Sequence, residues 1–434
     1  MRAKKQQLTR TVTITVISIA ILFVLVSTYS NWHHSTNDRN RLHDDLAAVD
    51  TSRGGLSILK EKHQGVIHKT RQTQQKTLTN AAPLRNANKK EAPKRDRKNT
   101  IFLQRPLPPK PPIRRANAAF VMLVRNSDGQ GARSAVRQIE DRFNRNFQYP
   151  YVFLNDVPFT EEFKELIRPM SKANITFGLV PAEHWSYPEW ISTTKVKEAR
   201  KAMANIVYGR SESYRHMCRY QSGFFFQHEA MLPFDYYWRI EPDVEFSCDL
   251  DFDPFLYMQD NNKKYAFAMS LPEYMETIPS LWNVTREFMD MYPHLLAENN
   301  ALDLISDDGG ESYNSCHFWS NFEIADARWM RDKAYQQYFN HLDQAGGFFY
   351  ERWGDAPVHS IAAALLLPID QIHFFKEIGY FHAPFYNCPA EPELQVKCHC
   401  DPNRNVNRER MSCTNRFLEL AGEKGMVFPE EIFD

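Results

Sequence analysis

The chain has 434 residues, of which 43% are hydrophobic, so it is long enough and apolar enough to build a sizeable core. Its formal net charge is zero, but residues 1–30 carry 4 basic and no acidic side chains and residues 31–115 carry 19 basic and 7 acidic ones, which leaves a net charge of −16 on residues 116–434. An acidic globular part excludes nucleic acid as the expected partner, because contacts with phosphates require positive charge.

The first predicted element is an uncharged run at residues 11–29, rich in Val, Ile and Leu. A helix of this length crosses a hydrocarbon core of about 30 Å. Basic residues precede it, so the positive-inside rule predicts a cytoplasmic tail at residues 1–10 and a lumenal remainder. The alternative is a cleaved signal peptide, whose apolar region is usually shorter and ends in a clear small-x-small site. We therefore predict an uncleaved, single-pass type II anchor.

Residues 30–115 are predicted to be a stem, because Lys, Arg, Asn, Gln and Thr dominate and no apolar period persists. The stem ends in a proline-rich stretch at residues 106–112, which favours a semi-rigid polyproline spacer. A flexible coil of this length spans roughly 50 Å, enough to hold a lumenal domain at residues 116–434 away from a membrane. Contact of the basic tract with an anionic surface is the alternative to a solvated linker.

From residue 116, short apolar runs alternate with helical stretches. Strands are predicted at residues 118–124, 151–154, 175–180, 236–240, 265–270 and 372–380. Helices are predicted after the first strand to about residue 146, and near 160–170, 195–206, 214–230, 285–298 and 357–367. This alternation predicts an α/β fold, with a sheet that binds ligands at the carboxyl ends of its strands.

All seven cysteines lie in the acidic domain, which indicates disulfides in an oxidising lumen and leaves at least one thiol free. A zinc site is the alternative for the C-terminal group, which comprises Cys388, Cys398, His399, Cys400 and Cys413. Its spacing does not match the usual two-residue gap between zinc ligands, so disulfides are favoured. Two glycosylation sequons, which begin at Asn174 and Asn283, fit lumenal exposure.

Two acids separated by one proline follow the aromatic strand predicted at residues 236–240. They are Glu241 and Asp243, and Pro242 restrains the backbone between them. Divalent cations prefer carboxylate oxygens, and an enzyme that uses a nucleotide sugar needs such a cation to neutralise the diphosphate leaving group. The spacing therefore indicates a metal and nucleotide site, with a solvent-exposed acidic turn as the alternative.

Glu323 lies in an aromatic, apolar stretch at residues 316–324. A carboxylate in such a place is costly to bury unless it is paired or used. One interpretation is a nucleophile or stabilising carboxylate that faces a sugar carbon. The alternative is a structural glutamate neutralised by a buried arginine such as Arg328.

Five further side chains are candidates for the same site. Arg125 follows the first strand, where such sheets meet a nucleotide, and Arg239 precedes the acidic pair. Tyr214 belongs to an aromatic and basic face that suits a diphosphate or a sugar, although such faces also pack in cores. Asp355 lies at the start of a predicted helix. Its side chain either caps this helix or binds an acceptor hydroxyl. His382 is either a packed histidine or a metal ligand.

Five ordered stretches together resemble the fungal Golgi α-1,2-mannosyltransferases of glycosyltransferase family 15. They are residues 214–218, 238–248, 313–324, 352–361 and 379–388. The resemblance covers essentially residues 116–434, and the anchor and stem layout agrees with it. It implies a GT-A-like fold with a mixed sheet flanked by helices, GDP-mannose as donor, a Mn²⁺ ion and retention of the anomeric configuration.

Carried over by position, the resemblance also implies roles for single residues. It makes Glu241 and His382 metal ligands, Glu323 the nucleophile, and Tyr214 a neighbour of the donor phosphates. Asp355 then lies on the acceptor side, and Asp243 belongs to the metal and nucleotide motif.

The predicted function is a retaining α-1,2-mannosyltransferase of the Golgi membrane. It would act on the 2-hydroxyl of mannose residues on O-linked or N-linked glycans of glycoproteins. A catalytically inactive, mannan-binding partner is one alternative, and an enzyme that forms another linkage, such as mannosylphosphate, is the other.

Overall fold

The computed structural model describes residues 114–423 and 425–426. The predicted tail, anchor and nearly all of the stem lie outside the described residues, so these boundaries stay predictions. Within the described part of the chain, no helix is long and apolar enough to cross a membrane.

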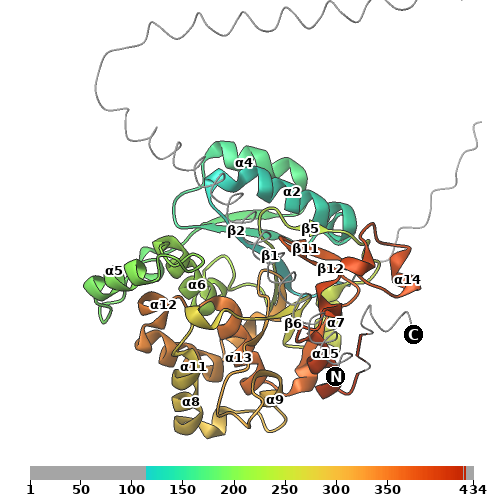
Figure 1. Ribbon diagram of the computed structural model, residues 1–434. Helices are drawn as coiled ribbons and strands as arrows, with labels where there is room; N and C mark the ends of the chain where they lie inside the picture. Colours follow the sequence, from blue (N-terminus) through green and yellow to red (C-terminus); the bar gives the residue numbers. More distant parts are fainter. Residues whose placement is uncertain (1–113, 424, 427–434) are drawn as a thin grey trace, which may run out of the picture. The chain divides into compact units, whose positions relative to one another are not determined.

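A seven-stranded mixed sheet forms the centre of the described domain (Figure 1). Its strands, in spatial order, are β10 (Ile372–Phe374), β6 (Tyr265–Phe267), β9 (Glu323–Asp326), β4 (Tyr236–Arg239), β1 (Ala118–Leu123), β2 (Tyr151–Asn155) and β3 (Ile175–Leu179). β9 runs antiparallel to both of its neighbours, whereas every other adjacent pair is parallel. The predicted α/β fold with a mixed sheet is therefore confirmed.

Two smaller antiparallel sheets complete the strand pattern. One has the order β12 (Phe385–Asn387), β11 (Tyr380–His382), β5 (Glu245–Phe246), and the other pairs β7 (Ser270–Pro272) with β8 (Cys316–Phe318). The single strand predicted at residues 372–380 is wrong, because a turn at Lys376 and Glu377 divides it between two sheets. The strand predicted at 265–270 is likewise divided into β6 and β7.

Helices cover both faces of the large sheet (Figure 1). On one side lie α2 (Gly129–Ile139), α4 (Glu161–Ile167) and α7 (Pro254–Asp260), and on the other α6 (Glu212–Gly223), α11 (Lys333–Ala345) and α13 (Asp355–Leu366). Side chains alternate between the faces, so Tyr237 and Trp238 are fully buried in two different clusters. Every predicted helical stretch contains a helix, but neither α7 nor α11 was predicted.

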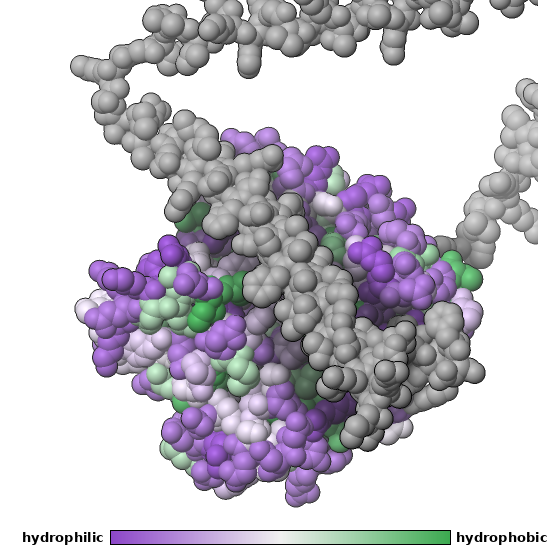
Figure 2. All heavy atoms as spheres, in the orientation of Figure 1, coloured by the Kyte–Doolittle hydropathy of each residue, from purple (hydrophilic) through white to green (hydrophobic). Residues whose placement is uncertain are grey.

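The remaining described helices are peripheral or short. They are α3 (Arg145–Phe147), α5 (Thr193–Ala202), α8 (Leu281–Met291), α9 (Leu302–Ile305), α10 (Ala327–Met330), α12 (Gly347–Tyr350), α14 (Pro392–Gln395) and α15 (Thr414–Leu420). On the face seen in Figure 2, hydrophilic side chains dominate and hydrophobic ones are scattered in small groups, which is the pattern of a surface in contact with water.

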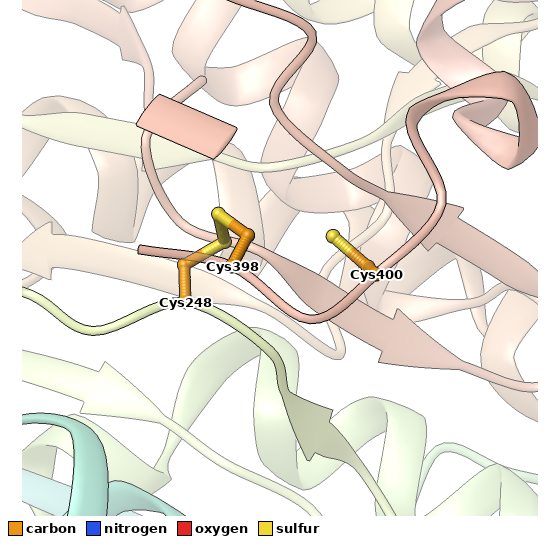
Figure 3. Close-up of side chains that lie close together, drawn as sticks. All are labelled: Cys248, Cys398 and Cys400. Atoms are coloured by element: carbon orange, nitrogen blue, oxygen red, sulfur yellow. A yellow bond between two sulfur atoms is a disulfide. The ribbon is translucent and has the colours of Figure 1, made fainter. Parts of the chain in front are cut away.

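The described domain contains three disulfides, two of which join its C-terminal part to earlier segments, while the third closes a short C-terminal loop. They are Cys248–Cys398, Cys316–Cys413 and Cys388–Cys400, and the buried Cys218 remains free. Figure 3 shows the Cys248–Cys398 bond with Cys400 beside it. The sulfur atoms of these three residues lie within 4.8 Å of one another, but each is already bonded to another sulfur and cannot serve as a thiolate ligand. The disulfide prediction is confirmed, and the zinc alternative is wrong.

Candidate active site

A cavity of about 170 Å³ lies at the carboxyl ends of β1, β2 and β4. It is lined by Leu123, Val124, Arg125, Asp128, Asn155, Asp156, Trp185, Met217, Gln221, Arg239, Glu241 and Pro242. This is the edge of the sheet at which parallel α/β folds bind their ligands, because the loops that follow the strands converge there. The cavity therefore combines acids, arginines and amides from segments far apart in the sequence.

Arg239, the last residue of β4, connects the acids on this edge. The residue is 4% exposed, and its guanidinium donates to Glu241 Oε1 at 2.6 Å and to Asp355 Oδ2 at 2.5 Å. Burial alone would raise the pKa of each carboxyl, but Arg239 lowers the pKa of both Glu241 and Asp355 to about 2. Both acids are therefore ionised at neutral pH, and a single cation holds them in place.

Glu241 also faces a histidine from a distant hairpin. His382 ends β11, and its Nε2 lies 3.6 Å from Glu241 Oε2. Two ligands of one divalent ion stand about 3 to 4 Å apart, because each lies about 2 Å from the ion. One carboxylate oxygen and one imidazole nitrogen therefore fit a divalent cation here, with oxygens of a phosphate or water as its remaining ligands.

Asp243, the second acid of the pair, points elsewhere. It is exposed, has a φ of 63°, and does not belong to the cavity lining. Its carboxylate lies against α2 so closely that a Cβ added at Gly131 would stand 2.5 Å from Oδ1. In this structure the acidic pair is thus divided, because Glu241 lines the cavity whereas the carboxylate of Asp243 lies against α2.

Glu323 is completely buried at the start of β9. Its Oε1 accepts from the Tyr237 hydroxyl at 2.9 Å, and its Oε2 accepts from the Tyr265 hydroxyl at 3.0 Å. The alternative in which Arg328 neutralises Glu323 is wrong, because Arg328 donates to Asp326 instead. Glu323 does not line the cavity, but its partner across the β4–β9 ladder is Arg239, which does.

His359, in α13, is the third partner of Glu323. Its Nδ1 lies 2.8 Å from Glu323 Oε2, and its Nε2 lies 3.1 Å from the backbone carbonyl of Gln221, a cavity residue. Burial alone would lower the pKa of His359, but the Glu323 carboxylate raises it above its ordinary value. Sequence reasoning assigned no role to His359, because only the fold shows what it faces.

The other candidates are Arg125, Tyr214 and Asp355, of which the last two are not among the residues that line the cavity. Arg125 lines the cavity and donates to Ser213 Oγ at 2.9 Å. The Tyr214 hydroxyl accepts from Arg352 at 3.1 Å, and the guanidinium lies over the tyrosine ring. Asp355 makes no cap to α13, because its carboxylate accepts from Arg239 and from Ser320 instead.

Asn155 is a cavity residue that sequence reasoning also missed. It ends β2 and is 1% exposed, and its Nδ2 has no hydrogen-bond partner among the described residues. An unpaired buried amide is costly, so a polar ligand atom in the cavity would stabilise it. The signal was present in the sequence, since Asn155 and Asp156 directly follow a predicted strand.

Comparisons with known proteins agree on one family. The model of the family described as glycolipid 2-alpha-mannosyltransferase matches residues 60–422. Glycolipid 2-alpha-mannosyltransferase 1 of Candida albicans is 54% identical over 311 residues, which cover 71% of this chain and 72% of that protein. Alpha-1,2 mannosyltransferase KTR1 of Saccharomyces cerevisiae is 52% identical over 310 residues, which cover 70% and 79% of the two chains.

Two solved structures are similar to this fold. Core-mannan synthase A (CmsA/Ktr4) of Aspergillus fumigatus, in its Mn/GDP form, has a TM-score of 0.68 and 41% identity, and the match covers 71% of this chain and 86% of that chain. The mannosyltransferase Ktr4p of S. cerevisiae, in complex with GDP, has a TM-score of 0.64 and 38% identity, with coverage of 66% and 76%.

Proposed function

Since the chain belongs to the glycolipid 2-alpha-mannosyltransferase family, we propose that it is a retaining α-1,2-mannosyltransferase that uses GDP-mannose. The relatives' names support the reaction and the linkage, and the two solved relatives support a guanine nucleotide and manganese. The observation in this chain that carries the proposal is that Glu241, which lines the cavity, faces His382.

In this proposal, Glu241 and His382 hold Mn²⁺, which when bound offsets negative charge on the diphosphate of the donor. Arg239 fixes one oxygen of Glu241 and leaves the other directed toward His382. Arg125 and Asn155 supply hydrogen-bond donors to the nucleotide from the ends of β1 and β2. We also assign Asp243 to the nucleotide side and Tyr214 to the donor phosphates, as the family resemblance implies.

The reaction breaks the bond between the anomeric carbon of mannose and the β-phosphate oxygen, and the electron pair leaves with GDP. A bond then forms from the acceptor 2-hydroxyl oxygen to the same carbon, and the hydroxyl proton passes to the departing phosphate. Attack on the leaving-group side retains the α configuration. Asp355, ionised beside Arg239, is assigned to the acceptor hydroxyl.

Glu323 is assigned to the developing positive charge on the sugar. Both of its oxygens accept hydrogen bonds, and the residue is fully buried behind Arg239. These constraints favour a fixed stabilising carboxylate and an ion-pair intermediate over covalent attack by Glu323. Three disulfides further support a lumenal domain, which we place behind the type II anchor predicted at residues 11–29, in the Golgi membrane.

The test uses the full-length chain in detergent, GDP-mannose and methyl α-mannoside. We expect GDP release that stops on chelation and returns with Mn²⁺, together with an α-1,2-linked product identified by linkage analysis. Binding of the acceptor without any turnover would favour the mannan-binding alternative. A mannosylphosphate or a different linkage would favour the second alternative.

A matched pair of variants tests the role of Glu323. Glu323→Gln is expected to lower turnover about 100-fold or more while GDP still binds, because a preorganised charge is lost from the transition state. Glu276→Gln makes the same chemical change at an exposed residue and should behave as wild type. Near-normal turnover of Glu323→Gln would remove Glu323 from the mechanism.

A further inference from the structure

We propose that His359 is a positioning residue that holds a proton beside Glu323 and thereby keeps this carboxylate ionised beneath the cavity. The inference deepens the proposed function, since it rests on the role assigned to Glu323. It concerns a residue that is not itself among those lining the cavity and is not one of the proposed cation ligands, although it contacts the lining residue Gln221.

The hydrogen-bond pattern fixes how many protons the pair holds. A backbone carbonyl is only an acceptor, so the nitrogen that faces Gln221 O at 3.1 Å must carry a hydrogen. The other nitrogen, Nδ1, lies 2.8 Å from Glu323 Oε2, and a contact of this length between two acceptors requires a second proton. The pair therefore holds two protons, one on Nε2 and one between Nδ1 and Glu323 Oε2. The second proton lies either on His359, which gives an imidazolium and a carboxylate, or on Glu323, which gives two neutral groups.

The two tyrosines decide between these forms. Tyr237 and Tyr265 both direct their hydroxyl groups at the oxygens of Glu323, and donors of this kind favour the ionised carboxylate. The proton then belongs on His359. The resulting ion pair is neutral as a unit, which lowers the cost of burying it where neither side chain is exposed to solvent.

Among the other charged groups near His359, the Asp355 carboxylate raises the pKa of the imidazole and the Arg239 guanidinium lowers it. Arg239 on β4, Asp355 at the start of α13 and Tyr335 on α11 face the pair from three packed elements. Arg239 donates hydrogen bonds to two carboxylates, those of Glu241 and Asp355, and among the described residues it donates none to Glu323. His359 supplies the second cation that three neighbouring acids require.

The pair lies directly behind the cavity. Gln221, whose carbonyl accepts from His359, and Arg239, which is paired with Glu323 across the ladder, both contribute to the lining. An ionised Glu323 therefore places negative charge behind Arg239, which lines the cavity. Loss of the imidazolium would remove the charged hydrogen bond that Glu323 Oε2 accepts from His359.

The first test is the pH profile of kcat for His359→Asn, measured in the full-length chain at saturating Mn²⁺. The asparagine amide keeps a donor near the position of Nδ1 but carries no charge. We expect kcat to fall and its acidic limb to move to higher pH by about one unit or more, with little change in KM for GDP-mannose. His359→Phe, which also removes the donor, should be worse, and His359→Asn should rescue part of that loss.

The matched control is His341→Asn, because the Nε2 of His341 also contacts a backbone carbonyl, that of Val284, outside this site. This variant should leave the acidic limb where it is in the wild type. An unchanged limb in His359→Asn, or an equal shift in both variants, would overturn the proposal.

The second test does not depend on activity. In chain labelled with ¹⁵N at its 15 histidines, the His359 signal is identified by its loss in His359→Asn. We expect both ring nitrogens to carry hydrogen at neutral pH, and Glu323→Gln to convert the ring to its neutral form. A neutral ring in the wild type would overturn the inference. If Glu323→Gln keeps full turnover while the ring is charged, the proposed role of Glu323 fails but the shared proton does not.

Discussion

Arg239 and Glu323 stand directly opposite each other on the antiparallel strands β4 and β9. Side chains at paired positions lie on the same face of a sheet, so a buried cation and a buried carboxylate are held side by side by backbone pairing. Arg239 then reaches outward to Glu241 and Asp355, whereas Glu323 reaches inward to His359. The β4–β9 ladder thus connects the rim of the cavity to the charged group beneath it.

Replacement of Arg239 by lysine should weaken Mn²⁺ binding and lower activity, although the charge is kept. In the wild type, two nitrogens of the guanidinium donate hydrogen bonds to two different carboxylates. The single ammonium group of lysine cannot reproduce this planar arrangement of donors. We expect the Mn²⁺ concentration for half-maximal GDP release to rise at least about tenfold, because the loss of one hydrogen bond to a charged group costs roughly 1.5–3 kcal/mol.

The control for this prediction is Arg331→Lys. Arg331 donates to three backbone carbonyls, those of Phe226, Phe234 and Met231. Its replacement therefore measures how much stability is lost when a partly buried guanidinium outside the site is removed. It should destabilise the fold without a change in Mn²⁺ dependence. Equal Mn²⁺ curves for wild type and Arg239→Lys would contradict the role of Arg239.

Asp355 should make the free energy of unfolding depend on pH in the acidic range. The pKa of its carboxyl is about 2 in the folded protein, below its ordinary value of 3.8, because Arg239 outweighs the effect of burial. A lowered folded pKa adds stability that is fully present above about pH 4 and is lost as the pH falls through about 2. The shift corresponds to about 2 kcal/mol.

Urea unfolding of wild type and Asp355→Asn at a series of pH values checks this expectation. The difference between the two free energies of unfolding should shrink by about 2 kcal/mol between pH 4 and pH 2. Parallel curves over this range would show that Asp355 is not ionised by its contact with Arg239.

Much of the sheet was predictable because its parallel strands are continuous apolar runs. β1 and β4 each lie inside a predicted strand, β2 extends one residue beyond its predicted strand, and the positions of the acids and amides at the ends of these strands mark the site. β9 was not predicted, although Glu323 at its start was singled out. The strand is four residues long, and its pairing with β4 and β6 depends on residues more than fifty positions away.

The hydrogen-bond partners of Glu323 also come from distant segments and could not be predicted from the sequence. Tyr237, Tyr265 and His359 come from β4, β6 and α13, and no local pattern marks any of them as a ligand of a carboxylate. Each residue by itself has the sequence signature of ordinary core. Disulfide connectivity was equally hidden, because spacing alone does not distinguish the possible pairings. Contacts between distant segments, rather than the residues themselves, were what the sequence could not predict.

Glycosylation at the two sequons tests the lumenal topology. The side chains of Asn174, just before β3, and Asn283, on α8, are both exposed. A chain that enters the secretory pathway with this topology should carry glycans at these positions. Endoglycosidase treatment should increase the gel mobility of the full-length protein, and Asn174→Gln and Asn283→Gln should each remove part of the shift. A chain with no enzyme-sensitive shift would contradict a lumenal domain.

The disulfides should contribute unequally to stability, because they close loops of very different length. Cys316–Cys413 spans 97 residues, whereas Cys388–Cys400 spans 12. In the chain-entropy account, a loop of roughly 100 residues stabilises the fold by about 4.7 kcal/mol and one of roughly 15 residues by about 3 kcal/mol. The Cys316→Ser, Cys413→Ser double variant should therefore lose more stability in urea unfolding than Cys388→Ser, Cys400→Ser. Double serine variants avoid unpaired thiols, and the reverse order of stabilities would show that native contacts near the shorter loop outweigh its entropy.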